Sequence, residues 1–254
     1  MTAESETEFP EKPKQRKGIY LLPNLFTTAA LFSGFYSIVA AINGRFEAAA
    51  VAIFVAMVLD GVDGRVARLT NTQSAFGMEY DSLADLISFG LAPALLMYKW
   101  SLASLGKVGW LAAFIYTVFA ALRLARFNTQ IDKVDKQHFQ GLPSPAAAAF
   151  VAGFVWVSHD YGFAGISLAF PALIVTLIAA VLMVSNIRYR SFKSLDLKVP
   201  VPFVSVLAVA ILFVLVSIDP PQILFLGFFI YAFSGPGFTL IQLRKRRLAR
   251  LKEG

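Results

Sequence analysis

The sequence predicts an all-α membrane protein, a polytopic bundle of about eight transmembrane helices. Of its 254 residues, 57% are hydrophobic and only 15% are charged, and the mean hydropathy is +0.65. A soluble domain of this length has too little interior to bury so many apolar side chains. The apolar runs approach the roughly 20 residues that a helix needs to cross a bilayer, about twice the length of a barrel strand.

Eight such runs follow one another along the chain, separated by short connections that contain charged residues, proline or glycine. They cover residues 25–42, 47–70, 78–98, 106–127, 143–158, 166–187, 200–218 and 221–243. Asn24 is expected to cap the first helix, because asparagine is a favoured N-cap residue. Backbone groups inside a bilayer must pair with one another, so runs joined by short connections are expected to form an up-and-down bundle.

Basic residues set the expected orientation. We expect a polar tail over residues 1–18, a transmembrane domain over 19–243 and a polybasic tail over 244–254. Of the 23 Lys and Arg residues, 20 lie in the two tails, in the second, fourth and sixth connections, or at the ends of the runs that precede those connections. The positive-inside rule therefore predicts a multi-pass protein of the cell (inner) membrane with both termini cytoplasmic.

The C-terminal tail also suits the anionic headgroups of membrane lipids. No nucleic-acid partner is expected, because basic and aromatic residues are not interleaved on a soluble module.

Four aspartates stand at the end of the second run and the start of the third. Asp60 and Asp63 are three residues apart and Asp81 and Asp85 are four apart, so each pair lies on one face of its helix. A short turn joins the two helices and can bring the pairs together near the cytoplasmic surface. Ionised side chains at membrane depth cost several kcal/mol, so they usually face a polar cavity and a compensating cation.

Oxygen ligands of this kind select hard divalent cations. The chain has no cysteine and only two histidines, so Mn²⁺ or Mg²⁺ is expected, with Ca²⁺ as a further candidate. Two ions would balance four carboxylates. Two alternatives remain: salt bridges with Arg45, Arg65 and Arg68, or proton relay and ion conduction in a non-enzymatic transporter. A transporter is expected to carry repeats and charges on several helices, whereas these acids lie on one helical hairpin.

The residues around the aspartates resemble the signature of the CDP-alcohol phosphotransferase family. The motif reads DGVDGRVAR over residues 60–68 and, eight residues later, GMEYDSLAD over residues 77–85. The resemblance implies that the metals are bound by Asp60, Asp63, Asp81 and Asp85. It also implies a CDP-binding pocket at Gly64, Ala67 and Arg68. Gly77, near the N-terminus of the third helix, is expected to leave room for the nucleotide there.

The resemblance also implies the chemistry. An alcohol attacks the phosphoanhydride of a CDP-linked lipid and CMP leaves, while the metals absorb the developing charge. Asp85 is the expected general base for the hydroxyl proton. Family members are often dimers, so a homodimer is expected.

The acceptor alcohol is expected to be L-serine, which would convert CDP-diacylglycerol into phosphatidylserine and CMP. Residues 22–27, 88–94, 123–128, 141–145 and 183–186 resemble the branch of the family that uses serine; glycerol phosphate and inositol phosphate are the alternative acceptors. The carboxylate of serine needs a cation or another polar partner at the same depth as Asp85. The candidates end the fourth and sixth runs, and they are Arg123, Arg126, Asn128, Arg188 and Lys193.

Overall fold

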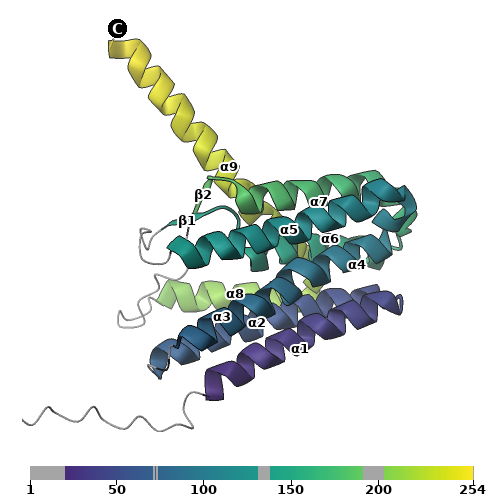
Figure 1. Cartoon of the computed structure of the whole chain (residues 1–254). Coiled ribbons are helices and arrows are strands. Elements are labelled where there is room, and N and C mark those ends of the chain that lie inside the picture. Colours follow the sequence, from purple (N-terminus) through teal and green to yellow (C-terminus); the bar gives the residue numbers. More distant parts are fainter. Residues whose placement is uncertain (1–20, 71, 73, 131–137, 191–202, 254) are drawn as a thin grey trace, which may run out of the picture.

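The structure is a computed structural model that describes residues 21–70, 72, 74–130, 138–190 and 203–253. Long helices dominate these residues and pack side by side (Figure 1). Their bounds are α1 Leu21–Ile42, α2 Phe46–Leu69, α3 Ala75–Asp85, α4 Ala92–Trp100, α5 Lys107–Gln130, α6 Ser144–Asp160, α7 Ala169–Val184, α8 Phe203–Ile218 and α9 Pro220–Glu253. A π-helical segment, η2 (Leu86–Leu91), makes α3 and α4 one continuous helix, and two 3₁₀ turns, η3 (Leu102–Leu105) and η4 (Gly165–Leu168), lie at connections.

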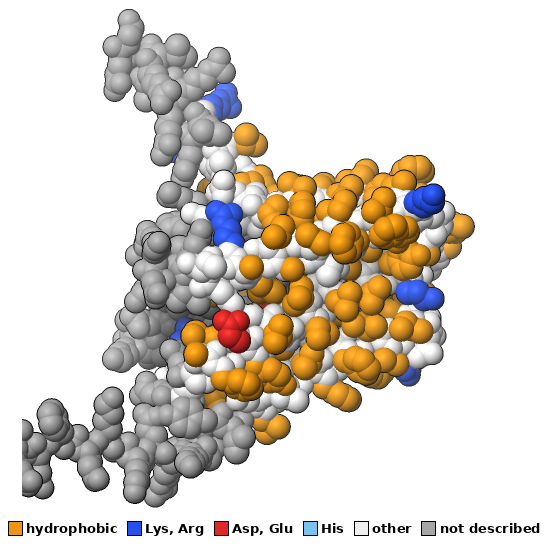
Figure 2. Space-filling model, viewed as in Figure 1, with side chains coloured by type: hydrophobic (Ala, Val, Ile, Leu, Met, Phe, Trp, Pro, Cys, Tyr) orange, Lys and Arg blue, Asp and Glu red, His pale blue; other side chains and the backbone are white. Residues whose placement is uncertain are grey.

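The prediction of a helical membrane protein is confirmed. Each of the eight predicted runs corresponds to a helical segment within the described residues. Five segments are long and apolar enough to cross a membrane, and they are Pro23–Ile42, Ala75–Trp100, Lys107–Thr129, Gly165–Val184 and Pro220–Ile241. The other three are α6 and α8, with 17 and 16 residues, and α2, which carries five charged residues. Hydrophobic side chains cover most of the face seen in Figure 2, with charged ones toward its ends.

Three expectations about the segment ends are changed or remain open. Helix α1 begins at Leu21, so Asn24 lies in its first turn and the prediction that it is the N-cap is wrong. Residues 244–253 of the predicted polybasic tail are helical, because α9 continues through Glu253. This helix of 34 residues is about 51 Å long at 1.5 Å per residue, and its C-terminal part extends away from the bundle (Figure 1). The predicted polar tail, residues 1–18, lies outside the described residues.

Two short strands were not predicted. β1 (His138–Gln140) follows α5 and β2 (Arg188–Arg190) follows α7, and they pair antiparallel with Phe139 opposite Tyr189. The pairing joins two connections that are far apart in the sequence. Both strands lie where α5 ends and α6 begins (Figure 1).

Small residues allow the helices of the core to approach closely. Residues 146–149 of α6 are four buried alanines, as expected of a close helix contact. On the same helix, a Cβ added to Gly153 would lie 3.1 Å from Phe225 Cα of α9. Helices α1 and η2 approach even more closely, because a Cβ on Gly34 would lie 2.7 Å from Ser88 Cα.

The π-helical segment fixes the end of α3, where Asp85 is the last residue. A π-helix shifts the hydrogen-bond register and is often found at functional sites. Its carbonyl at Phe89 accepts a hydrogen bond of 3.2 Å from the buried hydroxyl of Tyr116 in α5. Ser88 Oγ donates to Ala30 O of α1 at 3.1 Å. Two neighbouring helices therefore hold the backbone immediately after Asp85.

Candidate active site

The four aspartates of the signature line one cavity with a volume of about 460 Å³. Asp60 and Asp63 come from the last three turns of α2, and Asp81 and Asp85 come from α3. Ser74 caps α3 and its Oγ accepts a hydrogen bond of 3.0 Å from Gly77 N. The short turn between the helices thus brings the two acid pairs together, as their spacing predicts.

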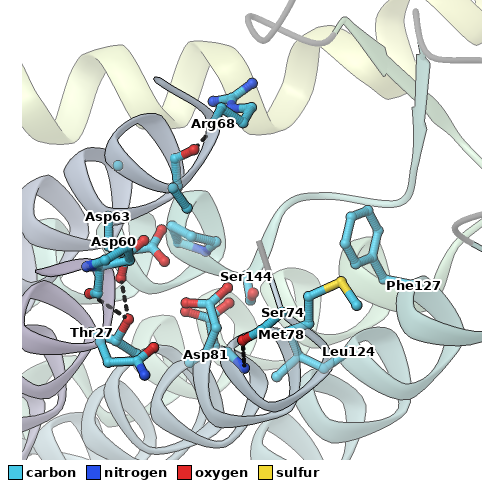
Figure 3. Close-up of a pocket in the computed structure, with 18 of the residues that line it drawn as sticks. Thr27, Asp60, Asp63, Arg68, Ser74, Met78, Asp81, Leu124, Phe127 and Ser144 are labelled. Atoms are coloured by element: carbon cyan, nitrogen blue, oxygen red, sulfur yellow. Dashed lines mark hydrogen bonds between the residues drawn. The ribbon is translucent and has the colours of Figure 1, made fainter. Parts of the chain in front are cut away.

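Three of the acids form a cluster suited to a metal ion. Asp60, Asp63 and Asp81 each offer a carboxylate oxygen, and these oxygens lie within 4.8 Å of one another (Figure 3). Asp63 is buried, and its Oδ2 accepts a hydrogen bond of 2.8 Å from Thr27 Oγ1 of α1. Asp85 interacts electrostatically with Asp60 and Asp81. An all-oxygen set of this kind fits a hard divalent cation.

The face of α2 beside the acids is open. A Cβ added to Gly61 or to Gly64 would meet nothing within 4 Å, and Gly64, Ala67 and Arg68 all line the cavity. Arg68 Nε donates to Gly64 O at 2.8 Å, which sets the course of its side chain along the helix. This surface has room for a flat ring and a phosphate group near the acids.

Gly77 also lines the cavity, but unlike Gly61 and Gly64 it has close neighbours. A Cβ at this position would lie 3.1 Å from Ser74 Oγ and 3.5 Å from Asn24 Oδ1. A side chain would therefore press on the cap of α3 and on the first turn of α1. The expectation that Gly77 leaves room for the nucleotide stays a prediction.

Arg123 brings a positive charge to the acids. It lies near the end of α5, lines the cavity, and interacts electrostatically with Asp85 and Asp60. Its Nη1 donates to Ser144 Oγ at 2.8 Å, and Ser144 is fully buried at the start of α6. Its Nε is buried and has no hydrogen-bond partner among the described residues. Arg123 is therefore held by Ser144 through Nη1, whereas its Nε has no partner among the described residues.

The other four candidates for the serine carboxylate are arranged differently. Arg126 donates to Gln140 Oε1, to Asn186 Oδ1 at 2.7 Å and to Val184 O at 3.5 Å. Asn128 Nδ2 donates to Ser82 Oγ at 3.0 Å. Neither residue lines the cavity. Arg188 belongs to β2, and Lys193 lies outside the described residues.

Sequence reasoning missed several cavity residues. Thr27, Gly61 and Ser144 line the cavity and were not named individually. Thr27 and Ser144 lie in stretches that resemble the family, residues 22–27 and 141–145. The local sequence gives no sign that a threonine on α1 bonds an aspartate 36 positions away.

Comparison with known proteins agrees with the signature. The family model for CDP-alcohol phosphatidyltransferase matches residues 20–185. A Helicobacter pylori protein named CDP-diacylglycerol–serine O-phosphatidyltransferase is 45% identical over 177 residues, which cover 69% of this chain and 74% of that protein. Proteins of the same name from Methanocaldococcus jannaschii and Bacillus subtilis are 33% and 35% identical, covering 72% and 68% of this chain and 80% and 91% of their own length. The chain therefore belongs to the CDP-alcohol phosphatidyltransferase family.

Proposed function

We propose that this protein transfers the phosphatidyl group of CDP-diacylglycerol to the hydroxyl of L-serine, forming phosphatidylserine and CMP. The observation that carries the proposal is the cavity lined by all four signature aspartates together with the partly buried Arg123. The names of the relatives, which include the bacterial and archaeal proteins above, favour serine among the possible alcohols.

Asp85 is the proposed catalytic base. It takes the proton of the serine hydroxyl as the serine oxygen bonds to the phosphorus that carries the diacylglycerol, and the bond from that phosphorus to CMP breaks. Arg123 interacts electrostatically with Asp85 and lines the same cavity. We further propose that Gly64, Ala67, Arg68 and Gly77 bind the CDP moiety.

The four aspartates are the proposed ligands of two divalent ions, Mn²⁺ or Mg²⁺. When bound, such metals would neutralise the charge that develops on the pyrophosphate. The open face of α2 supports this assignment, because it leaves the nucleotide access to the same end of the helix as Asp60 and Asp63.

The acceptor is tested by following CMP release from CDP-diacylglycerol with each alcohol in turn. The purified protein is expected to release CMP with L-serine and to incorporate labelled serine into lipid. Glycerol 3-phosphate and inositol phosphate serve as the competing acceptors. Faster CMP release with either of these alcohols would make that alcohol, and not serine, the acceptor in the same reaction.

The serine carboxylate is expected to bind Arg123. Its Nε has no hydrogen-bond partner among the described residues, and its charge interacts with that of the proposed base, Asp85. Arg123→Gln should raise the KM for serine roughly ten- to a hundredfold, the loss of one charged hydrogen bond in a sheltered site, and should change the KM for CDP-diacylglycerol far less.

Arg126→Gln is the matched control for this measurement. It removes the same charge from the same helix, three residues away, but it does not line the cavity, and its described hydrogen bonds are with Gln140 of β1, Asn186 and the Val184 carbonyl. Its KM for serine should therefore rise less than that of Arg123→Gln. Equal KM values for serine in Arg123→Gln and the parent protein would move the carboxylate site elsewhere.

We also propose that both termini and the active site face the cytoplasm. The chain has no cysteine, so single cysteines can report the topology. Ala103 in η3 and Lys245 in α9 are both exposed. In intact cells, an impermeant maleimide should label Ala103→Cys, whereas Lys245→Cys should react only after permeabilisation. The reverse pattern would invert the orientation.

The proposed assembly is a homodimer, which the family resemblance favours. Light scattering of the protein in detergent should then give twice the chain mass of 27.8 kDa. If the active protein in detergent has the mass of a single chain, the proposal of a homodimer is overturned.

A further inference from the structure

Ser144 joins the cavity to a part of the molecule outside it. It is the first residue of α6, it is fully buried, and it lines the cavity (Figure 3). Its Oγ accepts a hydrogen bond of 2.8 Å from Arg123 Nη1. A guanidinium is a rigid planar group, so a bond to one of its nitrogens also restricts the direction of the other two. The position of Ser144 therefore influences where Arg123 Nε points.

The chain just before Ser144 is bonded to the end of α7 and to the residues that follow it. Gly141 N donates to Ile187 O at 2.8 Å, and Leu142 N donates to Leu182 O at 2.9 Å. Leu142 is also fully buried. Two backbone hydrogen bonds thus tie the chain to the end of α7 only two residues before Ser144.

The residues between these bonds and Ser144 have little conformational freedom. Gly141 has a φ of 80°, which favours glycine, and a Cβ there would lie 2.2 Å from Met183 O. Pro143 and Pro145 flank Ser144, and each proline ring fixes its own φ at about −65°. A shift of Gly141 relative to α7 would therefore be passed on to Ser144.

Arg126 of α5 bonds the same two chain segments. It donates to Gln140 Oε1, to Asn186 Oδ1 at 2.7 Å and to Val184 O at 3.5 Å. Gln140 ends β1 directly before Gly141, and Asn186 lies two residues before β2. The guanidinium of Arg126 therefore reinforces the backbone bonds between the two segments.

Tyr189 of β2 anchors the strand pair on α9. Its hydroxyl donates to Ala232 O at 2.8 Å. That carbonyl lacks its usual helical donor, because Pro236, four residues later, has no N–H. The contact is close, since a Cβ on Gly235 would lie 2.5 Å from Tyr189 Cζ. Helix α9 thus helps to hold the strand pair in place.

The three stretches of sequence that meet here all resemble the branch of the family that uses serine. They are residues 123–128, 141–145 and 183–186. Arg123 in the first stretch bonds Ser144 in the second. Arg126 in the first stretch bonds Asn186 in the third. The fold thus gathers the three stretches around Arg123.

We propose that Ser144 is a positioning residue for the Arg123 guanidinium, and that the β1–β2 pair, bonded by Arg126, holds Ser144 in place. The inference deepens the proposed function, because it rests on Arg123 as the site of the serine carboxylate. It gives the two arginines different roles. Arg123 binds the acceptor, whereas Arg126 acts on acceptor binding through the chain that carries Ser144.

The test is a double-mutant cycle on the full chain, with the KM measured for serine and for CDP-diacylglycerol. Ser144→Ala removes the acceptor of Arg123 Nη1. It should raise the KM for serine roughly three- to tenfold, the range for the loss of one hydrogen bond, with little change in the KM for CDP-diacylglycerol. In an Arg123→Gln background Ser144→Ala should add almost nothing.

Ser158→Ala is the matched control. It is the same substitution on the same helix, and Ser158 is also buried but does not line the cavity. The two serines are 14 residues apart, which is about 21 Å along α6. Ser158→Ala should leave the KM for serine unchanged.

Asn186→Ala tests the more distant part of the arrangement. Asn186 is exposed, so this variant is expected to fold even if Ser144→Ala does not. It removes one acceptor of Arg126 and should raise the KM for serine in the same direction as Ser144→Ala, but by less. Arg126→Gln should act in the same way, and its effect should not add to that of Asn186→Ala. In the Arg123→Gln background Asn186→Ala should add almost nothing.

The inference is overturned if the effects of Ser144→Ala and Arg123→Gln on the KM for serine are additive, because Ser144 would then act on serine independently of Arg123. An equal rise in the KM of both substrates, or an unchanged KM for serine in Asn186→Ala, would also overturn it. A parent protein that releases no CMP with serine would instead refute the proposed function. The two failures are separate, since the second is seen in the parent protein and the first only in the variants.

Discussion

Asp85→Asn is expected to lower the rate of CMP release by roughly 10²- to 10⁴-fold, the usual contribution of a general base. The amide is nearly the same size as the carboxylate but cannot accept the hydroxyl proton of serine. CDP-diacylglycerol should still bind, because the other three aspartates and the open face of α2 remain. Single-turnover CMP release and equilibrium binding of CDP-diacylglycerol measure the two effects separately.

Asp160→Asn is the matched control for this experiment. Asp160 is exposed and ends α6, whose first residue, Ser144, lines the cavity. At 1.5 Å per residue the 17 residues of α6 place Asp160 about 24 Å from the site. This variant should turn over normally. A loss of lipid binding as complete as the loss of rate would make Asp85 chiefly a metal ligand.

The parts of the molecule predicted from sequence are those determined by local spacing. Apolar run length predicts the helices, because a bilayer sets their minimum length. The spacing of Asp60 and Asp63, and of Asp81 and Asp85, puts each pair on one helix face, and the short connection joins the two faces. These features need no knowledge of distant contacts, and the structure brings the four aspartates to one cavity.

The features that sequence could not predict depend on partners far along the chain. Arg123 and Arg126 are three residues apart and looked equivalent as serine ligands. Arg123 differs from Arg126 in its partners. Arg123 donates to Ser144 and interacts electrostatically with Asp85, whereas Arg126 donates to Gln140 and Asn186. The hydrophobic pattern of residues 86–91 likewise does not indicate a π-helix, which Tyr116 and Ser88 help to hold.

Helix α9 illustrates the same limit. The sequence predicts a membrane span over residues 221–243 followed by a basic tail, and Pro236 lies within that span. Only the structure shows that the helix continues past this proline and that Tyr189 supplies the missing donor. A motif search confined to residues 20–185 covers neither partner of this hydrogen bond.

Metal removal is the second change with a large expected effect. EDTA should abolish CMP release, and Mn²⁺ or Mg²⁺ should restore it, because the proposed cations would neutralise the charge that develops on the pyrophosphate and would let three carboxylates share so small a space in ionised form. Ca²⁺ can be compared in the same assay, since it accepts the same oxygen ligands with a looser geometry. Undiminished turnover after exhaustive chelation would contradict the metal assignment.

Thermal unfolding gives a test of the metal site that does not depend on activity. A cation that binds only the folded protein adds about 2.7 kcal/mol of stability at a hundred times its Kd, so Mn²⁺ should raise the unfolding midpoint of the chelated protein. Asp63→Asn removes one charge from the cluster while the amide oxygen can still accept from Thr27. More Mn²⁺ should then be needed for the same rise, whereas Asp160→Asn should respond like the parent protein. An equal Mn²⁺ response in all three proteins would mean that the ion binds away from the aspartates of the signature.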